Sequence, residues 1–135
     1  MAEASDYEID YERRKEVSEL SEQIAVFNWA EFAKHKYPQL KFLFAIPNGG
    51  SRHIAEAVNL KKSGTKSGVP DMCLPVKRGE YGALYIEMKS DKGKVSPFQS
   101  DWLKYLNENG YKAVVCRSSG EAIDTITKYL KGLEL

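Results

Sequence analysis

Four short apolar segments most constrain what this chain of 135 residues can fold into. They span residues 41–46, 72–76, 83–89 and 113–116, and Pro, Gly or Ser residues lie close to their ends, as is typical of buried strands. Only residues 77–82 separate the second segment from the third, which favours a hairpin. The other connections are long enough for helices. We therefore expect an α/β fold in which helices cover a mixed β-sheet.

The connecting segments carry the patterns of helices, which gives the order α-β-α-β-β-α-β-α. Apolar residues repeat at steps of three and four from about Ser18 until Tyr37-Pro38. Three further helices are expected after capping serines, at 52–62, at 97–109 and from Ser118 to about Leu130. Trp29, Trp102 and Tyr105 share helical spacings with other apolar residues, so we expect them in the core rather than as platforms for base stacking.

Charge is unevenly distributed along the chain. The net charge is +1, yet residues 1–31 hold nine acidic and three basic side chains, a charge of −6, which leaves +7 on residues 32–135. We interpret residues 1–17 as an acidic, loosely docked lead-in and residues 18–132 as one domain. A basic body is compatible with a phosphate-rich ligand, although a solvated charged helix beside an ordinary surface explains the same numbers.

Nothing in the sequence indicates export or membrane insertion. No apolar stretch approaches the roughly 18 residues that span a bilayer, and the start of the chain has no signal-peptide pattern. Cys73 and Cys116 each lie inside an apolar segment, where a free thiol behaves as a small buried hydrophobe. We therefore expect a soluble protein of the reducing cytoplasm.

Two acidic residues and a lysine fall close together around the predicted hairpin. Strand alternation places Glu87 and Lys89 on one face, and Asp71, at the start of the preceding strand, comes to lie beside Glu87. Converging carboxylates repel each other unless a cation lies between them, and hard oxygen ligands with room for water suit Mg²⁺ or Mn²⁺. Lys89 could then orient an attacking water and stabilise charge on a phosphate. The alternative is an ordinary ion pair on a solvated sheet face.

The same residues match a known signature. Pro70-Asp71, followed 16 positions later by Glu87-Met88-Lys89, resembles the motif of the PD-(D/E)XK nuclease superfamily. From about Ser18 to Leu130 the chain resembles one family within it, the virus-type replication-repair nuclease (VRR-NUC) family. The motifs that carry this resemblance are Ser18-Glu19 with Gln23 and Trp29, Pro47-Asn48-Gly49-Gly50 with Arg52, Gly68-Val69-Pro70-Asp71, Ile86-Glu87-Met88-Lys89, Ser96-x-x-Gln99 with Trp102, Gly110-Tyr111 and Glu121-Ala122-Ile123.

The resemblance implies a restriction-endonuclease-like fold and a metal-dependent nuclease. In such a nuclease, Asp71 and Glu87 would bind the ion. The backbone carbonyl oxygen of Met88 would complete the set of metal ligands, and Lys89 would orient the attacking water.

Two further site positions are taken from the resemblance. The acidic residue that the family carries on its first helix falls on Glu19, and Glu22 is close enough to be the true ligand instead. Gln99 would face the metal site, where it could hold Lys89 or the attacked phosphate. Its position three residues after Ser96 is equally explained by a reciprocal capping box.

Loop and basic residues around this site are expected to contact DNA. The loop of Asn48, Gly49, Gly50 and Arg52 runs into a predicted helix N-terminus, which is a natural anion site. Basic side chains in loops that are expected to flank the site add backbone contacts that weaken with salt. These are Lys61, Lys62, Lys66, Lys77, Arg78, Lys92 and Lys94.

The expected function is that of an Mg²⁺- or Mn²⁺-dependent endodeoxyribonuclease. Stand-alone minimal members of the family resemble Holliday-junction resolvases, and symmetric cutting of two strands requires two active sites on a two-fold axis, so branched DNA and a homodimer are implied. The minimal form also suggests a phage or bacterial protein of DNA repair. A monomeric nuclease of flaps or free ends and a non-catalytic DNA-binding module are the alternatives.

Overall fold

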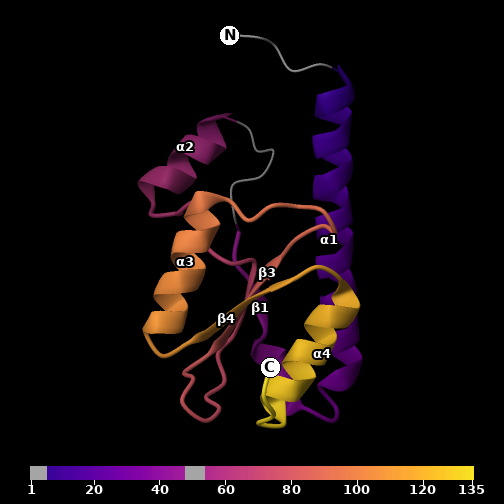
Figure 1. Cartoon of the computed structure of the whole chain (residues 1–135), viewed down its shortest axis with the longest axis vertical. Coiled ribbons are helices and arrows are strands. Elements are labelled where there is room, and N and C mark those ends of the chain that lie inside the picture. The colour runs from indigo at the N-terminus through magenta and orange to yellow at the C-terminus, as the bar shows by residue number, and fades with distance from the viewer. Residues whose placement is uncertain (1–5, 48–53) are drawn as a thin grey trace.

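The computed structural model describes residues 6–47 and 54–135. Within them, a four-stranded sheet in the order β1-β2-β3-β4 lies between helices, with α1 and α4 on one side and α3 on the other (Figure 1). The elements are α1 (Asp6–Ala33), the 3-10 helix η1 (Pro38–Phe42), β1 (Phe44–Ala45), α2 (Ile54–Lys62), β2 (Met72–Leu74), β3 (Leu84–Met88), α3 (Pro97–Glu108), β4 (Lys112–Cys116) and α4 (Ser119–Leu130). The predicted α/β class and the order of helices and strands are confirmed.

The sheet is mixed, as predicted. β1 pairs antiparallel with β2, and β2 pairs antiparallel with β3 through a hairpin that sets Met72 opposite Ile86. β3 and β4 run parallel, and a parallel pair requires a crossover, which α3 supplies. The hairpin therefore lies at one end of β2 and β3, and Asp71 and Glu87 lie at the other.

One face of β3 builds the main core. Leu84, Ile86 and Met88 are buried in the same cluster as Val26 of α1 and Ile126 of α4. The alternate positions of β3 face α3. Because a register shift of one residue would turn the charged face of β3 into this core, burial of the apolar face fixes where the charged residues lie.

Helix α1 is longer at its N-terminus than its apolar periodicity predicts. It begins at Asp6 rather than at about Ser18, and it ends at Ala33, before the expected stop at Tyr37. Residues 6–17 contain no Pro or Gly and are rich in acidic residues, which are favourable near a helix N-terminus. Figure 1 shows these first turns extending past the sheet, where no core imposes an apolar period.

The first apolar segment forms less strand than expected. Pro38 opens η1, so only Phe44 and Ala45 remain as a short strand at the sheet edge. The other strands, and α2, α3 and α4, lie within two residues of their predicted bounds. Among the described residues, no helix combines the length and the apolar character needed to cross a membrane.

One of the three predicted core aromatics, Tyr105, lies at the surface of α3, and Trp102 is half-buried. Trp29 packs against the core as expected. Tyr105 is 58% exposed, because α3 buries Leu106 instead, and Trp102 and Tyr105 line a shallow surface depression. The helical spacing therefore predicted a buried position correctly for Trp29, only in part for Trp102 and wrongly for Tyr105.

Candidate active site

Asp71 and Glu87 meet at the end of the sheet away from the hairpin. Asp71 directly precedes β2, and the register of β2 and β3 brings it beside Glu87. Oδ2 of Asp71 accepts a hydrogen bond of 2.7 Å from the backbone N–H of Met88. This bond ties the residue before β2 to the last residue of β3, so the position of Asp71 depends on the register of the hairpin.

Glu87 is a buried acid whose hydrogen-bonding capacity is only half used. The residue is 2% exposed, and its Oε1 accepts a hydrogen bond of 2.9 Å from Nε2 of Gln99. Its Oε2 is buried and has no hydrogen-bond partner within the described part of the chain. Burial first, and then the charge of Asp71, raise the pKa of Glu87 to about 8. A carboxylate in this position is costly unless a proton or a cation compensates it.

The carboxylate pair fits a divalent cation. A cation beside Asp71 and Glu87 would relieve their repulsion and would pair with the open Oε2 atom. Across residues 6–47 and 54–135, no group of three or more His, Cys, Asp or Glu side chains could hold a metal ion. Mg²⁺ commonly takes one or two protein carboxylates and fills its other positions with water and phosphate oxygens. The pair therefore suits a magnesium-type site that solvent and substrate complete.

Gln99 uses both ends of its side-chain amide. Its Oε1 accepts from the backbone N–H of Ser96 over 2.9 Å, and its backbone N–H donates to Oγ of Ser96 over 3.2 Å, which forms a complete capping box at the start of α3. Its Nε2 remains to donate to Glu87. The two interpretations of Gln99, helix cap and site residue, are thus compatible, and the cap aims the amide at the carboxylate.

Lys89 lies two residues after Glu87, where β3 leaves the sheet. Its backbone N–H donates to the carbonyl oxygen of Cys116 over 2.9 Å, which extends the pairing of β3 and β4 by one residue. Lys89 is only 8% exposed, and its charge lowers the pKa of Glu87 against the effects of burial and of Asp71. The face that carries these charges is therefore enclosed and is not the solvated sheet face of the alternative interpretation.

Glu19 and Glu22 of α1 point to different neighbours. Oε1 of Glu19 accepts from the backbone N–H of Ser90 over 3.1 Å, and its charge contributes to the raised pKa of Glu87. Oε2 of Glu22 accepts from the backbone N–H of Ser119 over 2.5 Å, and this bond lowers the pKa of Glu22. Glu19 thus bonds to the loop directly after Lys89, at the site end of the sheet, whereas Glu22 caps the N-terminus of α4.

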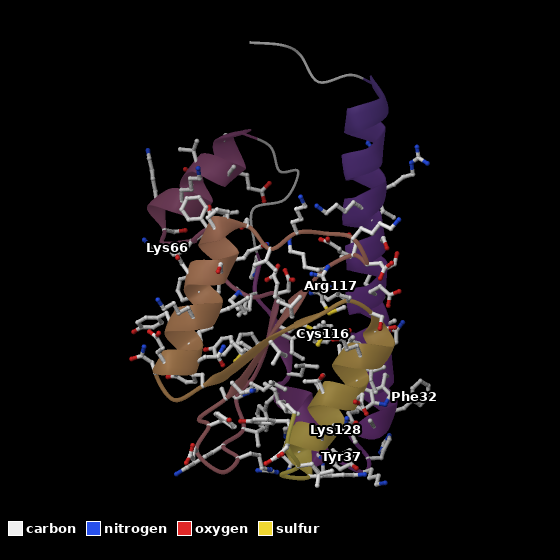
Figure 2. The ribbon with its side chains drawn as sticks, in the orientation of Figure 1. Phe32, Tyr37, Lys66, Cys116, Arg117 and Lys128 are labelled. Atoms are coloured by element: carbon white, nitrogen blue, oxygen red, sulfur yellow. The ribbon has the colours of Figure 1, made fainter. Side chains whose placement is uncertain are left out.

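The lysines expected to contact DNA lie in two segments that adjoin the site in sequence. One segment is the loop after Lys89, and the other is the end of α2 with the turn that leads toward Asp71. The side chains concerned are all exposed: Lys61, Lys62, Lys66, Lys92 and Lys94. Figure 2 shows Lys66 between α2 and α3. The predicted phosphate-binding loop, Asn48, Gly49, Gly50 and Arg52, lies outside the described residues.

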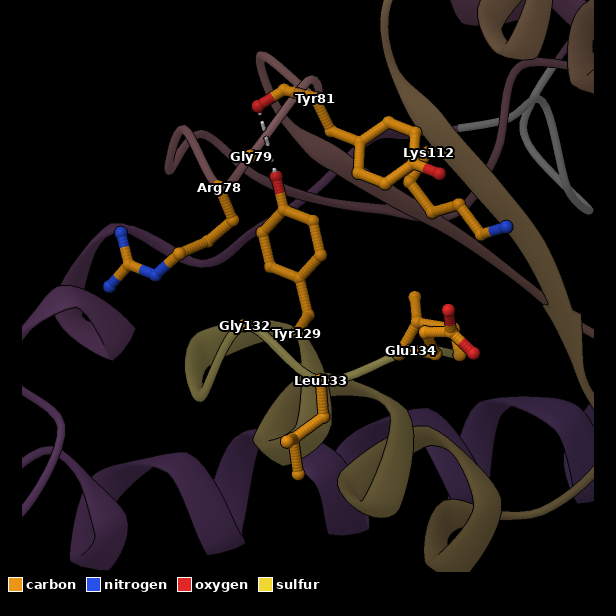
Figure 3. A pocket seen from close by; sticks show the side chains of 9 residues that line it. Arg78, Gly79, Tyr81, Lys112, Tyr129, Gly132, Leu133 and Glu134 are labelled. Atoms are coloured by element: carbon orange, nitrogen blue, oxygen red, sulfur yellow. Dashed lines mark hydrogen bonds between the residues drawn. The ribbon is translucent and has the colours of Figure 1, made fainter.

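Lys77 and Arg78 lie at the opposite end of the sheet, so the expectation that they flank the site is wrong. Both belong to the hairpin between β2 and β3. Nε of Arg78 donates to the carbonyl oxygen of Leu130 over 3.1 Å and so satisfies a free carbonyl at the end of α4. Figure 3 shows the cavity beside it, of about 350 Å³, which the hairpin, Lys112 and the C-terminal residues line.

Arg117 is a further residue at the site end that sequence patterns did not reveal. It follows β4 directly, and the parallel register sets it next to Lys89. Its guanidinium donates to backbone carbonyls of the loop after Lys89, and Figure 2 shows it beside this end of the sheet. The only signal in the sequence is a basic residue after the last strand, because its partners are neighbours only through the pairing of β3 and β4.

Comparisons with known proteins point to one family. A family model described as VRR-NUC domain matches residues 2–120. A solved structure described as a VRR_NUC domain protein matches with a TM-score of 0.72 at 30% sequence identity, over 87% of this chain and 96% of that chain. No protein with a curated description matches the sequence significantly.

Proposed function

The chain belongs to the VRR-NUC family of nuclease domains, and from this premise we propose that it is an endonuclease that hydrolyses phosphodiester bonds of DNA with Mg²⁺ or Mn²⁺. The observation that carries the proposal is the buried Oε2 atom of Glu87, which meets no hydrogen-bond donor in the described chain and belongs to a carboxylate beside Asp71. Such a pair is stable only if something positive compensates it.

Asp71, Glu87 and the backbone carbonyl of Met88 would hold the cation. Glu19 would be a further carboxylate near it, although Glu19 does not form one metal-holding cluster with the pair in the described residues. A divalent cation bound there supplies polarisation of the scissile phosphate and lowers the pKa of a bound water. The N–H of Met88 fixes the orientation of Asp71 by donating to its Oδ2 atom. The protein thereby presents its oxygen ligands in a fixed arrangement before a substrate arrives.

Lys89 and Gln99 complete the proposed catalytic group. The ammonium group of Lys89 lies in an enclosed site, where its interaction with a phosphate is stronger than at a solvated surface. It would orient the attacking water and stabilise the negative charge that develops on the phosphate oxygens. Gln99 donates to Oε1 of Glu87, which leaves the other carboxylate oxygen directed toward the cation.

The proposed substrate is branched DNA, cut by a homodimer. One protomer carries one carboxylate pair, so the paired incisions that resolve a junction require a second copy related by a two-fold axis. Exposed lysines on both segments beside the site would contact phosphates of the DNA arms without reading sequence. We include Asn48, Gly49 and Arg52 in this proposed DNA-contacting group.

The experiment offers labelled four-way junctions, flaps and linear duplexes to the protein in Mg²⁺, Mn²⁺ or EDTA, and measures molar mass by light scattering with and without junction. We expect metal-dependent, symmetrically paired cuts in the junction by a dimer. A monomer that cuts flaps or ends alone would replace the resolvase proposal with the monomeric nuclease. Tight junction binding without any cleavage in Mn²⁺ would instead indicate a non-catalytic DNA-binding module.

A further inference from the structure

We propose that Arg117 is a positioning residue that sets the Glu19 carboxylate at the metal site by clamping the loop after Lys89. The inference rests on the proposed function, because the placement of Glu19 matters to catalysis only if the site binds a cation. Under this proposal Arg117 acts through the loop and through Glu19, without contacting the cation or the reacting phosphate.

One guanidinium nitrogen forms the clamp. Nη1 of Arg117 donates to the carbonyl oxygens of Ser90 over 3.0 Å and Gly93 over 2.6 Å, and it lies 3.4 Å from the carbonyl oxygen of Asp91. The backbone N–H of Gly93 also donates to the carbonyl oxygen of Ser90 over 3.0 Å, so the loop forms a tight turn. Carbonyl dipoles that converge in this way are held together by a positive charge, since a charged donor makes the stronger hydrogen bonds.

The loop connects the clamp to α1. The carbonyl of Ser90 is held by Arg117, while its N–H donates to Oε1 of Glu19 over 3.1 Å. A loop that opened would move this N–H, and Glu19 would lose its hydrogen-bond donor. Ser90 directly follows Lys89, so the N–H that holds Glu19 lies one residue beyond the proposed catalytic lysine, at the site end of β3.

The loop turns tightly at Gly93, close to the side chain of Ser90 and to Lys15 of α1. A Cβ atom added at Gly93 would lie 2.8 Å from Oγ of Ser90 and 3.3 Å from Cε of Lys15 on α1. The first distance is shorter than any ordinary contact, so a side chain at position 93 would displace the loop. The loop therefore has no room for a side chain at position 93 while Arg117 holds its carbonyl groups.

Arg117 is itself held in place by α4. Its backbone N–H donates to Oε2 of Glu121 in the first turn of that helix over 3.1 Å. Two residues later, the N–H of Ser119 donates to Glu22 of α1. The turn between β4 and α4 thus contacts α1 in two ways. Ser119 bonds directly to Glu22, and Arg117 acts through the loop that bonds to Glu19. Both links support the position of Glu19.

The test compares Mn²⁺ binding by calorimetry in the wild-type protein, Glu19→Gln, Arg117→Gln and the double variant. We expect Arg117→Gln to weaken binding about tenfold, the scale of losing a support of a metal ligand, and Glu19→Gln, which removes the supported carboxylate itself, to weaken it at least as much. The double variant should bind as Glu19→Gln does, because Arg117 acts through Glu19. Arg78→Gln is the matched control: Arg78 also donates to a backbone carbonyl, but at the far end of the sheet, so this change should leave binding unaltered.

Two results would overturn the inference. One is Mn²⁺ binding by Arg117→Gln that equals the wild type, and the other is a double variant in which the two losses multiply. Arg117→Lys covers the case in which Arg117→Gln does not fold, since it keeps the charge but not the guanidinium geometry. Its effect should be smaller, in the same direction, and absent when Glu19 is already Gln.

Amide hydrogen exchange in the metal-free protein separates this inference from the proposed function. Arg117→Gln should accelerate exchange at Ser90, whose N–H donates to Glu19, and should leave Met88, whose N–H donates to Asp71, unchanged. A wild-type protein that binds no Mn²⁺ would overturn the proposed function. Normal Mn²⁺ binding by the wild type, with unchanged exchange at Ser90 in the variant, would overturn only the role of Arg117.

Discussion

The two ends of the β2–β3 pair differ in how their polar side chains are satisfied. At the hairpin end, the hydroxyl of Tyr129 donates to the carbonyl oxygen of Val76 over 2.6 Å, and Arg78 donates to the end of α4. At the other end, Glu87 is buried beside Asp71 with one oxygen that no described residue pairs. Contacts of the first kind contribute to stability, whereas the second arrangement opposes it. Function is expected where the fold tolerates such a cost.

The cavity in Figure 3 does not mark the carboxylate pair. The cavity in Figure 3 lies at the hairpin end, where Arg78, Tyr81 and Tyr129 contribute to its wall and make structural contacts. The carboxylate pair lies at the other end, on an enclosed sheet face. The cavity at the hairpin end therefore lies beside structural contacts, whereas the unsatisfied buried carboxylate oxygen lies at the end with Glu87.

The largest effect is expected from removing the unsatisfied charge. Glu87→Gln should lower DNA cleavage by roughly 10³-fold, because a neutral amide cannot replace a carboxylate toward a cation, and it should not lower the free energy of unfolding in metal-free buffer. Cleavage kinetics and thermal denaturation measure both. Glu80→Gln, an exposed acid in the hairpin, is the matched control and should change neither. Cleavage retained by Glu87→Gln would remove Glu87 from the mechanism.

The pH dependence of the free energy of unfolding should also distinguish the end with Glu87 from the hairpin end. Glu87 has a pKa of about 8 in the fold against an ordinary value of 4.5. As pH rises from 4.5 to 8 the unfolded chain releases this proton and the folded chain retains it, so the free energy of unfolding of the metal-free protein should fall, by roughly a few kcal/mol.

Denaturation of the wild type and Glu87→Gln across this pH range isolates the effect, since other titrating groups are shared. The variant should lack this part of the pH slope. Mg²⁺ should stabilise the wild type more at pH 8 than at pH 6, because the cation competes with the proton for Glu87. Parallel curves for the two proteins would show that Glu87 ionises normally in the fold.

Gln99 and Ser96 offer a smaller and sharper test, because they share one capping box. Gln99→Ala and Ser96→Ala should each lower the free energy of unfolding by about 1 kcal/mol through loss of the cap. Only Gln99→Ala also removes the donor to Glu87, and it should lower cleavage by about tenfold or more. Equal activity of the two variants would mean that Gln99 serves the helix alone.

The smallest effect on cleavage is expected at the hairpin end. Tyr129→Phe leaves the carbonyl of Val76 without its hydroxyl donor and should lower the free energy of unfolding by about 1 kcal/mol. Cleavage measured well below the melting temperature should stay at the wild-type rate. A large loss of activity in a folded Tyr129→Phe protein would show that the two ends are coupled.

Local patterns were sufficient to predict the central part of the site. Asp71, Glu87 and Lys89 were grouped correctly because a hairpin brings neighbouring strands together with a register that alternation defines. Gln99 was assigned to the site through the family resemblance, and its capping pattern explained the same position separately. The structure shows that one amide serves both the cap and the carboxylate.

Long-range packing determines what the sequence could not show. The separation of Glu19 from Glu22 depends on how α1 lies against the loop after β3 and against α4, which begins 97 residues after Glu22. Arg117 meets its loop only through the parallel pairing of β3 with β4. The early start of α1 was missed because turns that extend past the core need no apolar period.

The shared amide of Gln99 has a consequence for the lifetime of the assembled site. Helix ends open and close far more often than whole domains unfold. When the first turn of α3 frays, the contacts of Gln99 with Ser96 break, and the amide that holds Glu87 loses its anchor at the same moment. The fraction of time for which the carboxylate is correctly held is therefore set by the local opening equilibrium of one helical turn.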